Sequence, residues 1–209
     1  TEVRLDRLHA LDFAQDRARI GVIDTIELDL ERVSTLSVGD ELVDGAQSRE
    51  EVQEQRDRDI PYELVYSDAE RQNWLHYVDD FNAELRLVPA GGRDRPEVAR
   101  HVAPHLPVFS DDDLLAWGRE AEDSREAALA MRHVAVAAPE EFDPEFLSVL
   151  VKGLKHPDPA VRVVTIYACA YPAWTELKPV MKEIEAGDVD PRVRAAASRL
   201  LASLLGIGR

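Results

Sequence analysis

The chain has 209 residues and carries 41 acidic against 25 basic residues, a formal net charge of −16. Nucleic-acid binders need clustered cations to displace counterions from phosphate, so this balance argues against DNA or RNA as a partner. No run of about 18 apolar residues occurs, so no membrane span is expected. Cys169 is the single cysteine. An internal disulfide is therefore excluded, which fits a reducing, cytoplasmic compartment.

The first sixty residues contain only weak signals for regular structure. Apolar residues at helical spacing predict a short helix over 4–16, and alternating apolar and polar residues predict a strand within 20–38. Residues 47–59 form a charged run, which is typical either of a solvated helix or of disorder. These patterns indicate small elements of both kinds and resemble no known family.

The clearest β pattern follows directly. In the first segment, 60–66, the alternate positions are Ile60, Tyr62, Leu64 and Tyr66. In the second, 74–78, they are Trp74, His76 and Val78, with Leu75 and Tyr77 on the other face. Residues 67–70 lie between the two segments and contain the polar residue types that turns favour. Two alternating segments around a short turn predict a β-hairpin.

Three further elements complete the prediction for this half of the chain. A strand is expected over 84–88, a loop at Gly91-Gly92, and a helix within 96–106 that packs on the sheet. Prolines near its end make 104–110 the expected junction. We therefore predict that residues 1–109 form a small α+β domain with an antiparallel sheet.

Residues 110–209 are predicted to be helical throughout, with short links. Ser110, Asp123 and Asp143 are typical helix N-caps, and acidic residues or proline follow them in the first turn. Prolines also mark the ends of helices, because proline cannot continue one. Six helices are predicted, beginning after Ser110, Asp123, Asp143 and Asp158, near Ala173, and at Pro191. Short links between them indicate three helical hairpins.

Two of the predicted hairpins nearly repeat each other. Asp158-Pro-Ala-Val-Arg162 and Asp190-Pro-Arg-Val-Arg194 differ at one position and start 32 residues apart, a period typical of stacked helical hairpins. Residues 143–171 and 175–205 resemble the HEAT-repeat family, specifically its short bacterial HEAT-like variety. The hairpin at 111–138 matches less well, since Ala128 takes the place of Arg162.

The resemblance implies an α-solenoid of about three HEAT-like hairpins over residues 110–209. In this family the paired Asp and Arg residues bond between neighbouring hairpins, and the second helices line a concave face. Aligning the second helices places His133, Tyr167 and Arg199 in one slot, with Arg132 in the adjacent one. These residues are the predicted partner-binding row, the alternative being an ordinary solvated face. Trp174 is a further candidate, either as an exposed docking ledge or as packing between hairpins.

The sequence contains no convincing metal, cofactor or nucleophile motif, so we predict no catalytic residue, metal or cofactor. His101 and His105 are four residues apart, but Pro104 interrupts the helix between them. His76 lies close to Asp79 and Asp80, an arrangement that a strand followed by a turn explains. Cys169 sits in an apolar run without a neighbouring base and is predicted to belong to the core.

These features favour a protein-binding module or adaptor, such as an inhibitor or immunity-type protein that neutralises a basic protein or peptide. An acidic surface speeds the encounter with a basic partner, although the charge also serves solubility. The alternative is an enzyme, lyase-like or peptide-modifying, with a pocket between the sheet and the first hairpin that includes Tyr62, Trp74 and His76. A purely structural subunit is the third reading, and nothing in the sequence separates it from the first.

Overall fold

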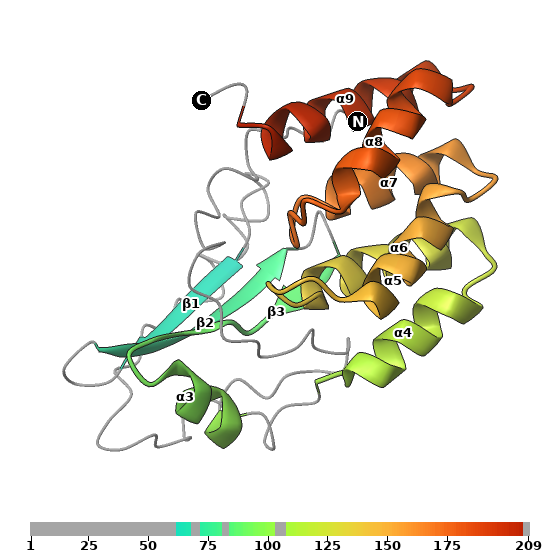
Figure 1. The fold of residues 1–209 in the computed structure, drawn as a ribbon. Coiled ribbons are helices and arrows are strands. Elements are labelled where there is room, and N and C mark those ends of the chain that lie inside the picture. Colours follow the sequence, from blue (N-terminus) through green and yellow to red (C-terminus); the bar gives the residue numbers. More distant parts are fainter. Residues whose placement is uncertain (1–61, 68–71, 81–83, 103–107, 207–209) are drawn as a thin grey trace. The chain divides into compact units, whose positions relative to one another are not determined.

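A computed structural model describes residues 62–67, 72–80, 84–102 and 108–206 of the chain. The elements predicted within the first sixty residues lie outside these ranges, as do the turn at 68–70 and the segment 103–107 with His105. The described chain is a mixture of antiparallel strands and helices (Figure 1). It divides into two compact units, residues 1–82 with 86–108 and residues 83–85 with 109–209.

The first unit contains the predicted β-hairpin. Strand β1 (Tyr62–Ser67) pairs antiparallel with β2 (Asn73–Asp80), with Tyr62 opposite Asp79 and Ser67 opposite Trp74. Leu75 and Tyr77 alternate along β2 and are buried, as a half-buried strand requires. The short strand β3 (Leu85–Leu87) extends the sheet beside β2.

The Gly91-Gly92 segment was expected to be a loop, and this prediction is wrong. It belongs to strand β4 (Ala90–Gly92), which pairs antiparallel with β2 and places Gly91 opposite Trp74. A Cβ atom at Gly91 would lie 1.9 Å from the Trp74 indole, so only glycine allows the strand to pass beneath the ring. Helix α3 (Arg95–Val102) follows and packs on β2 and β4.

The six predicted helices of the second unit are all present. They are α4 (Asp111–Glu120), α5 (Ser124–Ala137), α6 (Pro144–Leu154), α7 (Pro159–Ala168), α8 (Leu177–Gly187) and α9 (Pro191–Leu204). Ser110 forms a capping box with Asp113, and an aspartate caps α5, α6, α7 and α9. Helix α8 begins later than predicted, since Ala173 adopts a left-handed backbone conformation with φ 50° and is not helical.

Successive helices pack as three hairpins, α4 with α5, α6 with α7 and α8 with α9. The second helix of each hairpin packs on the next, α5 on α7 and α7 on α9, and α4 also packs on α6 (Figure 1). Large apolar side chains fill the contacts and are almost fully buried, among them Leu114, Met131, Leu150, Ile166 and Met181. Burial of such side chains is the main favourable contribution to stability.

One charged pair joins the second and third hairpins. The Arg162 guanidinium donates to both carboxylate oxygens of Asp188, with Nε 2.8 Å from Oδ2 and Nη2 2.9 Å from Oδ1. Its Nη1 also donates to the carbonyls of His156 and Pro157 in the α6–α7 turn. Both side chains are only 10% exposed. Arg162 therefore donates to the carbonyls of the α6–α7 turn and at the same time binds the carboxylate of the α8–α9 turn.

The repeated aspartates do not bind the arginines between hairpins as the family resemblance implied, although Asp158 accepts a hydrogen bond from Ser124 of the first hairpin. Asp158 and Asp190 accept hydrogen bonds from main-chain amides of α7 and α9, which makes them N-caps. The bond between hairpins uses Asp188, two residues before the repeated Asp190. The pairing of Arg162 across the hairpins is thus present, but its acceptor is not the aspartate of the repeat motif.

Removing either member of the Arg162–Asp188 pair should destabilise the helical unit. We expect Arg162→Ala and Asp188→Ala each to lower the free energy of unfolding by about 2–3 kcal/mol, because each leaves a largely buried charged group without its partner. Urea denaturation followed by circular dichroism measures this. Arg192→Ala is the control, since its exposed pair with Asp190 is screened by solvent and contributes far less.

The same pair predicts acid sensitivity. Hydrogen bonds from Arg162 hold the pKa of the Asp188 carboxyl below its usual value. The contribution is therefore complete above the unfolded pKa of about 3.9. It is lost as the pH falls through the lower pKa of the folded state. Asp188→Asn should flatten the stability profile in this acidic range, and an unchanged profile would contradict the role of the pair.

Gly153 lies at a second point of close packing, where α6 approaches Met131 on α5 and Thr165 on α7. An added Cβ would lie 2.5 Å from the Met131 Sδ and 2.7 Å from the Thr165 Oγ1. Gly153→Ala should therefore destabilise by about 1–3 kcal/mol in thermal or urea unfolding. Gly187 is the matched control, since no heavy atom lies within 4 Å of an added Cβ there. Gly187→Ala should be neutral or stabilising, and equal losses in both variants would contradict this packing.

Candidate partner-binding surface

The second helices of the three hairpins share one pattern of burial. The buried stripe is Ala127, Ala130, Met131, Val134 and Ala135 on α5, and Val193, Ala196, Ala197, Leu200 and Leu201 on α9. On α7 it includes Val161, Thr165, Ala168 and Cys169, whereas Val164, the counterpart of Ala130 and Ala196, is half-buried. Ile166 is also fully buried on α7, although it lies outside the stripe. Four of the five stripe positions on α7 are thus buried in the alignment that places His133, Tyr167 and Arg199 in one slot. His133, Tyr167 and Arg199 therefore occupy equivalent positions on the three second helices.

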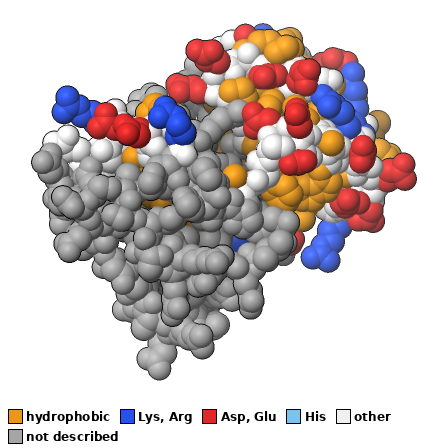
Figure 2. Space-filling model, turned by 90° about the horizontal axis from the view of Figure 1, so that it is seen from below, with side chains coloured by type: hydrophobic (Ala, Val, Ile, Leu, Met, Phe, Trp, Pro, Cys, Tyr) orange, Lys and Arg blue, Asp and Glu red, His pale blue; other side chains and the backbone are white. Residues whose placement is uncertain are grey.

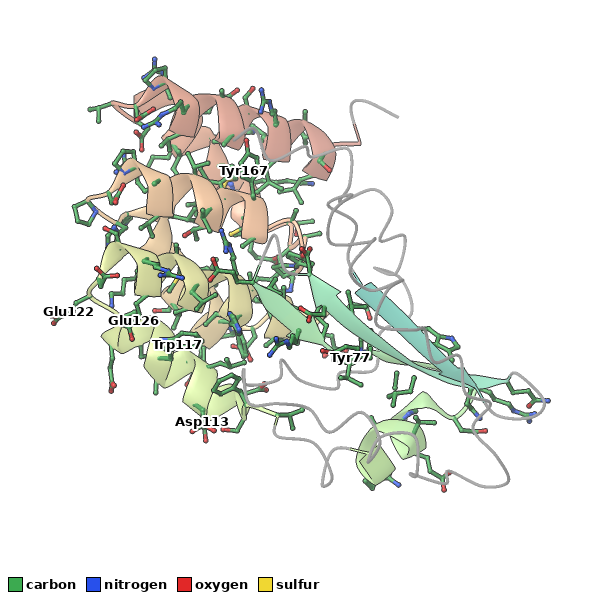
Figure 3. All side chains as sticks on the ribbon, turned by 180° about the vertical axis from the view of Figure 1, so that it is seen from behind. Tyr77, Asp113, Trp117, Glu122, Glu126 and Tyr167 are labelled. Atoms are coloured by element: carbon green, nitrogen blue, oxygen red, sulfur yellow. The ribbon has the colours of Figure 1, made fainter. Side chains whose placement is uncertain are left out.

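Two residues of the predicted row meet directly. The Arg199 Nη1 on α9 donates a hydrogen bond of 3.2 Å to the Tyr167 hydroxyl on α7. Arg199 is exposed and Tyr167 is half-buried, so the pair belongs to the surface while the ring packs between helices. Figure 3 shows the position of Tyr167 on α7. Stacking of α7 on α9 is thus what brings the two side chains together.

His133 occupies the same slot on α5 but is buried, with 6% of its surface exposed. Its ring lies 5.0 Å from that of Trp117 and 6.2 Å from that of Phe109, both in edge-to-face arrangements. Its Nδ1 is 2.9 Å from the Leu129 carbonyl. The expected open row therefore stops at Tyr167, because aromatic side chains from before and within α4 cover the histidine. Arg132, the neighbouring candidate, is half-buried.

Trp174 is 4% exposed and is not a docking ledge. Its Nε1 donates to the carbonyls of Pro139, at 2.9 Å, and Glu140, at 3.2 Å, in the link between the first and second hairpins. Phe142 packs edge-on against the indole at 5.5 Å. Trp174 therefore joins the α5–α6 link to the α7–α8 link, which lie more than thirty residues apart in the chain. This is the packing alternative considered from the sequence.

The residues of the alternative pocket do not share one face of the sheet. The register sets Tyr62 opposite Asp79, so position 62 belongs to the face of Asp79 and Tyr77. Positions 74 and 76 belong to the other face, since successive residues of a strand alternate. Trp74 covers Gly91 of β4. The register thus assigns position 62 to one face of the sheet and positions 74 and 76 to the other.

A tryptophan that sequence reasoning did not select lies near the first hairpin. Trp117 on α4 is half-buried, contacts His133, and donates from its Nε1 to the Glu126 carboxylate on α5 at 3.2 Å (Figure 3). In the sequence, Trp117 follows the apolar pair Leu114 and Leu115. That pattern indicates only that the side chain packs in the core. Its partners come from other segments, so they were not apparent in the sequence.

Hydrogen bonds favour the ionised form of two carboxylates in the turns, Asp158 and Asp190. The Ala160 amide, and then the Ser124 hydroxyl, lower the pKa of Asp158. Hydrogen bonds from the Arg192 side chain and amide lower the pKa of Asp190 to about 2. An acid with so low a pKa is a poor proton donor or acceptor near neutral pH, which requires a pKa close to the working pH. These groups therefore cap helices and contribute negative charge.

Within the described ranges, no group of three or more His, Cys, Asp or Glu side chains is arranged to hold a metal ion. None of the helices that the structure describes is both long and apolar enough to cross a bilayer. Comparison of the chain with protein-family models, with curated proteins and with solved structures finds no match. Functional inference therefore depends on the surface and packing described above.

Cys169 gives a direct test of the packing of α7. The thiol is completely buried, and burial raises its pKa to about 12. At pH 8 only about one thiol in ten thousand is then the reactive thiolate. Ellman's reagent should label the native protein very slowly and label one thiol per chain in denaturant. Rapid labelling of the native protein would contradict this placement of the thiol.

Proposed function

We propose that the chain is a protein-binding module, an adaptor or inhibitor rather than an enzyme, in which HEAT-like hairpins form an α-solenoid. The binding surface is the exposed side of the second helices around Tyr167 and Arg199. The observation that carries the proposal is the hydrogen bond between these two residues, because it links adjacent second helices through side chains that remain at the surface. Packing of α5 on α7 and of α7 on α9 supports a continuous surface across the hairpins.

Tyrosine and arginine suit such a surface because they are enriched among residues whose truncation strongly weakens protein interfaces. The hydrogen bond holds both side chains in one arrangement before a partner arrives. A restrained side chain loses less conformational entropy on binding, and this favours affinity. The apolar stripe beneath them packs α7 against α9, and the Arg162–Asp188 bond fixes the register of these helices, so the pair is presented on a rigid support.

A basic protein or peptide is the partner that the charge favours. The net charge is −16, and the helix-capping carboxylates with lowered pKa values remain ionised well below neutral pH. Figure 2 shows acidic side chains spread over the described surface, with basic and hydrophobic ones between them. Long-range attraction of this kind mainly raises the association rate and is weakened by salt.

We expect Tyr167→Ala and Arg199→Ala each to weaken a bound partner about tenfold or more, a loss of at least about 1.4 kcal/mol. Stability should change much less, because neither residue belongs to the fully buried stripe. The partner is identified by affinity capture with the wild-type chain, and its dissociation constant is then measured by calorimetry for each variant.

Arg119→Ala is the matched control, since it removes an exposed arginine that pairs with Glu145 outside the proposed surface. Its affinity should equal that of the wild type. Unchanged affinity of both the Tyr167 and Arg199 variants for the captured partner would refute the proposed surface. Failure to recover any partner across several conditions would count against a binding function.

A further inference from the structure

The Arg162–Asp188 pair shows which groups an arginine binds at this position of the repeat. We use it as the template for Arg194, the equivalent arginine of the last hairpin. Arg162 uses Nη1 for the two carbonyls of its own turn, and its Nε and Nη2 for the carboxylate of the following turn. The carboxylate also accepts from the Asp190 amide at 2.8 Å, which holds it in place. The site thus consists of an arginine from one hairpin and a turn carboxylate from the next.

Arg194 repeats the first half of this template at the end of the helical unit. Its Nη1 donates to the carbonyls of Asp188 and Val189, the counterparts of the carbonyls that Arg162 binds. No partner for its Nε or Nη2 is found among residues 62–67, 72–80, 84–102 and 108–206. Arg194 is half-buried and its Nη1 is held by the turn, so the described residues leave the Nε and Nη2 edge of its guanidinium open.

The carboxylate half of the template is found at the opposite end of the helical unit, in the first hairpin. Aligned by the buried stripes, Glu122 in the α4–α5 turn takes the place of His156 and Asp188 in the later turns. Helix α5 begins one residue earlier relative to its stripe, so Glu122 directly precedes its N-cap Asp123, whereas His156 and Asp188 lie two residues before theirs. The equivalence of those two is direct, since the His156 Nδ1 accepts from the Asp158 amide as Asp188 accepts from Asp190. Glu122 is exposed, lies at the outer edge of its turn (Figure 3), and has no partner within the described part of the chain.

We propose that copies of this chain associate head to tail, with Arg194 of one copy binding Glu122 of a second copy. The turns between α4 and α5, α6 and α7, and α8 and α9 lie along one edge (Figure 1). A second copy placed as a further hairpin would therefore bring its first turn to Arg194. The contact uses different residues from the proposed partner surface and does not depend on that function.

Other features of the last hairpin favour an interface there. Helix α9 carries three arginines and no acidic residue in a chain whose net charge is −16. One of them, Arg192, is already paired with Asp190, and Arg199 binds Tyr167 on the proposed partner surface, which leaves Arg194 as the positive charge of α9 at this interface. Val189, which is 89% exposed, and Leu205, which is 48% exposed, are the large hydrophobic side chains left uncovered on this hairpin. Uncovered apolar residues beside a positive surface are typical of interaction sites.

The expected assembly is weak and open-ended. A head-to-tail contact uses two different patches, so each bound copy presents a fresh copy of both, and chains grow unless the rotation closes a ring. Ser198 on α9 takes the place of the buried Ile166 on α7, so this end offers less apolar area than the contacts between hairpins. Repulsion between acidic copies opposes association at low ionic strength, where screening is weak.

Sedimentation velocity of the full chain across a concentration series in 0.15 M salt, about the physiological ionic strength, tests the proposal. The wild type should show a mean mass that rises with concentration. Arg194→Glu and Glu122→Arg should each weaken association by at least about tenfold, or about 1.4 kcal/mol. An equimolar mixture of the two variants should associate again, because the Glu122→Arg chain keeps Arg194 and the Arg194→Glu chain keeps Glu122, so the native contact can form between them.

The recovery in the mixture separates a lost contact from a misfolded variant. Lys182→Glu and Glu120→Arg are the matched controls, since they make the same charge changes at exposed positions near the two sites and should associate as the wild type does. A wild type that remains monomeric at every concentration would overturn the proposal. Association of the wild type that persists in both single variants, or a mixture that stays monomeric, would overturn it as well.

Discussion

The bond between Arg162 and Asp188 is the interaction on which the arrangement of the helical unit most depends. Apolar contacts hold helices α7 and α9 together. On their own, these contacts would allow one helix to slide along the other to a neighbouring register with little loss of free energy. The bidentate bond accepts only one register, since both carboxylate oxygens and two turn carbonyls must be reached by one guanidinium. The alignment of Tyr167 with Arg199 at the surface follows from that register.

Local features of the sequence were sufficient to predict much of this unit. Asp143-Pro144, Asp158-Pro159 and Asp190-Pro191 each place a capping carboxylate before a proline that suits the first turn, and helices α6, α7 and α9 begin there. The β-hairpin was equally legible from alternation. These signals act over a few residues, so one sequence is enough to identify them.

Features that depend on distant segments were not predictable. His133 occupies the predicted slot but is buried by Phe109 and Trp117, whose approach depends on how α4 packs on α5. Asp188 precedes the repeated Asp190, and only the folded turn reveals which carboxylate meets Arg162. The part of the predicted row that reaches the surface is consequently shorter than expected, and it lies on the second and third hairpins.

If Arg162 couples the last two hairpins into one cooperative unit, its removal should loosen the third hairpin selectively. Native-state hydrogen exchange, measured by mass spectrometry on the wild type and on Arg162→Ala, detects this. We expect equal protection across α6 to α9 in the wild type, and a selective loss of protection in α8 and α9 in the variant. Separate, unequal protection of α8 and α9 in the wild type, unchanged by the substitution, would contradict it.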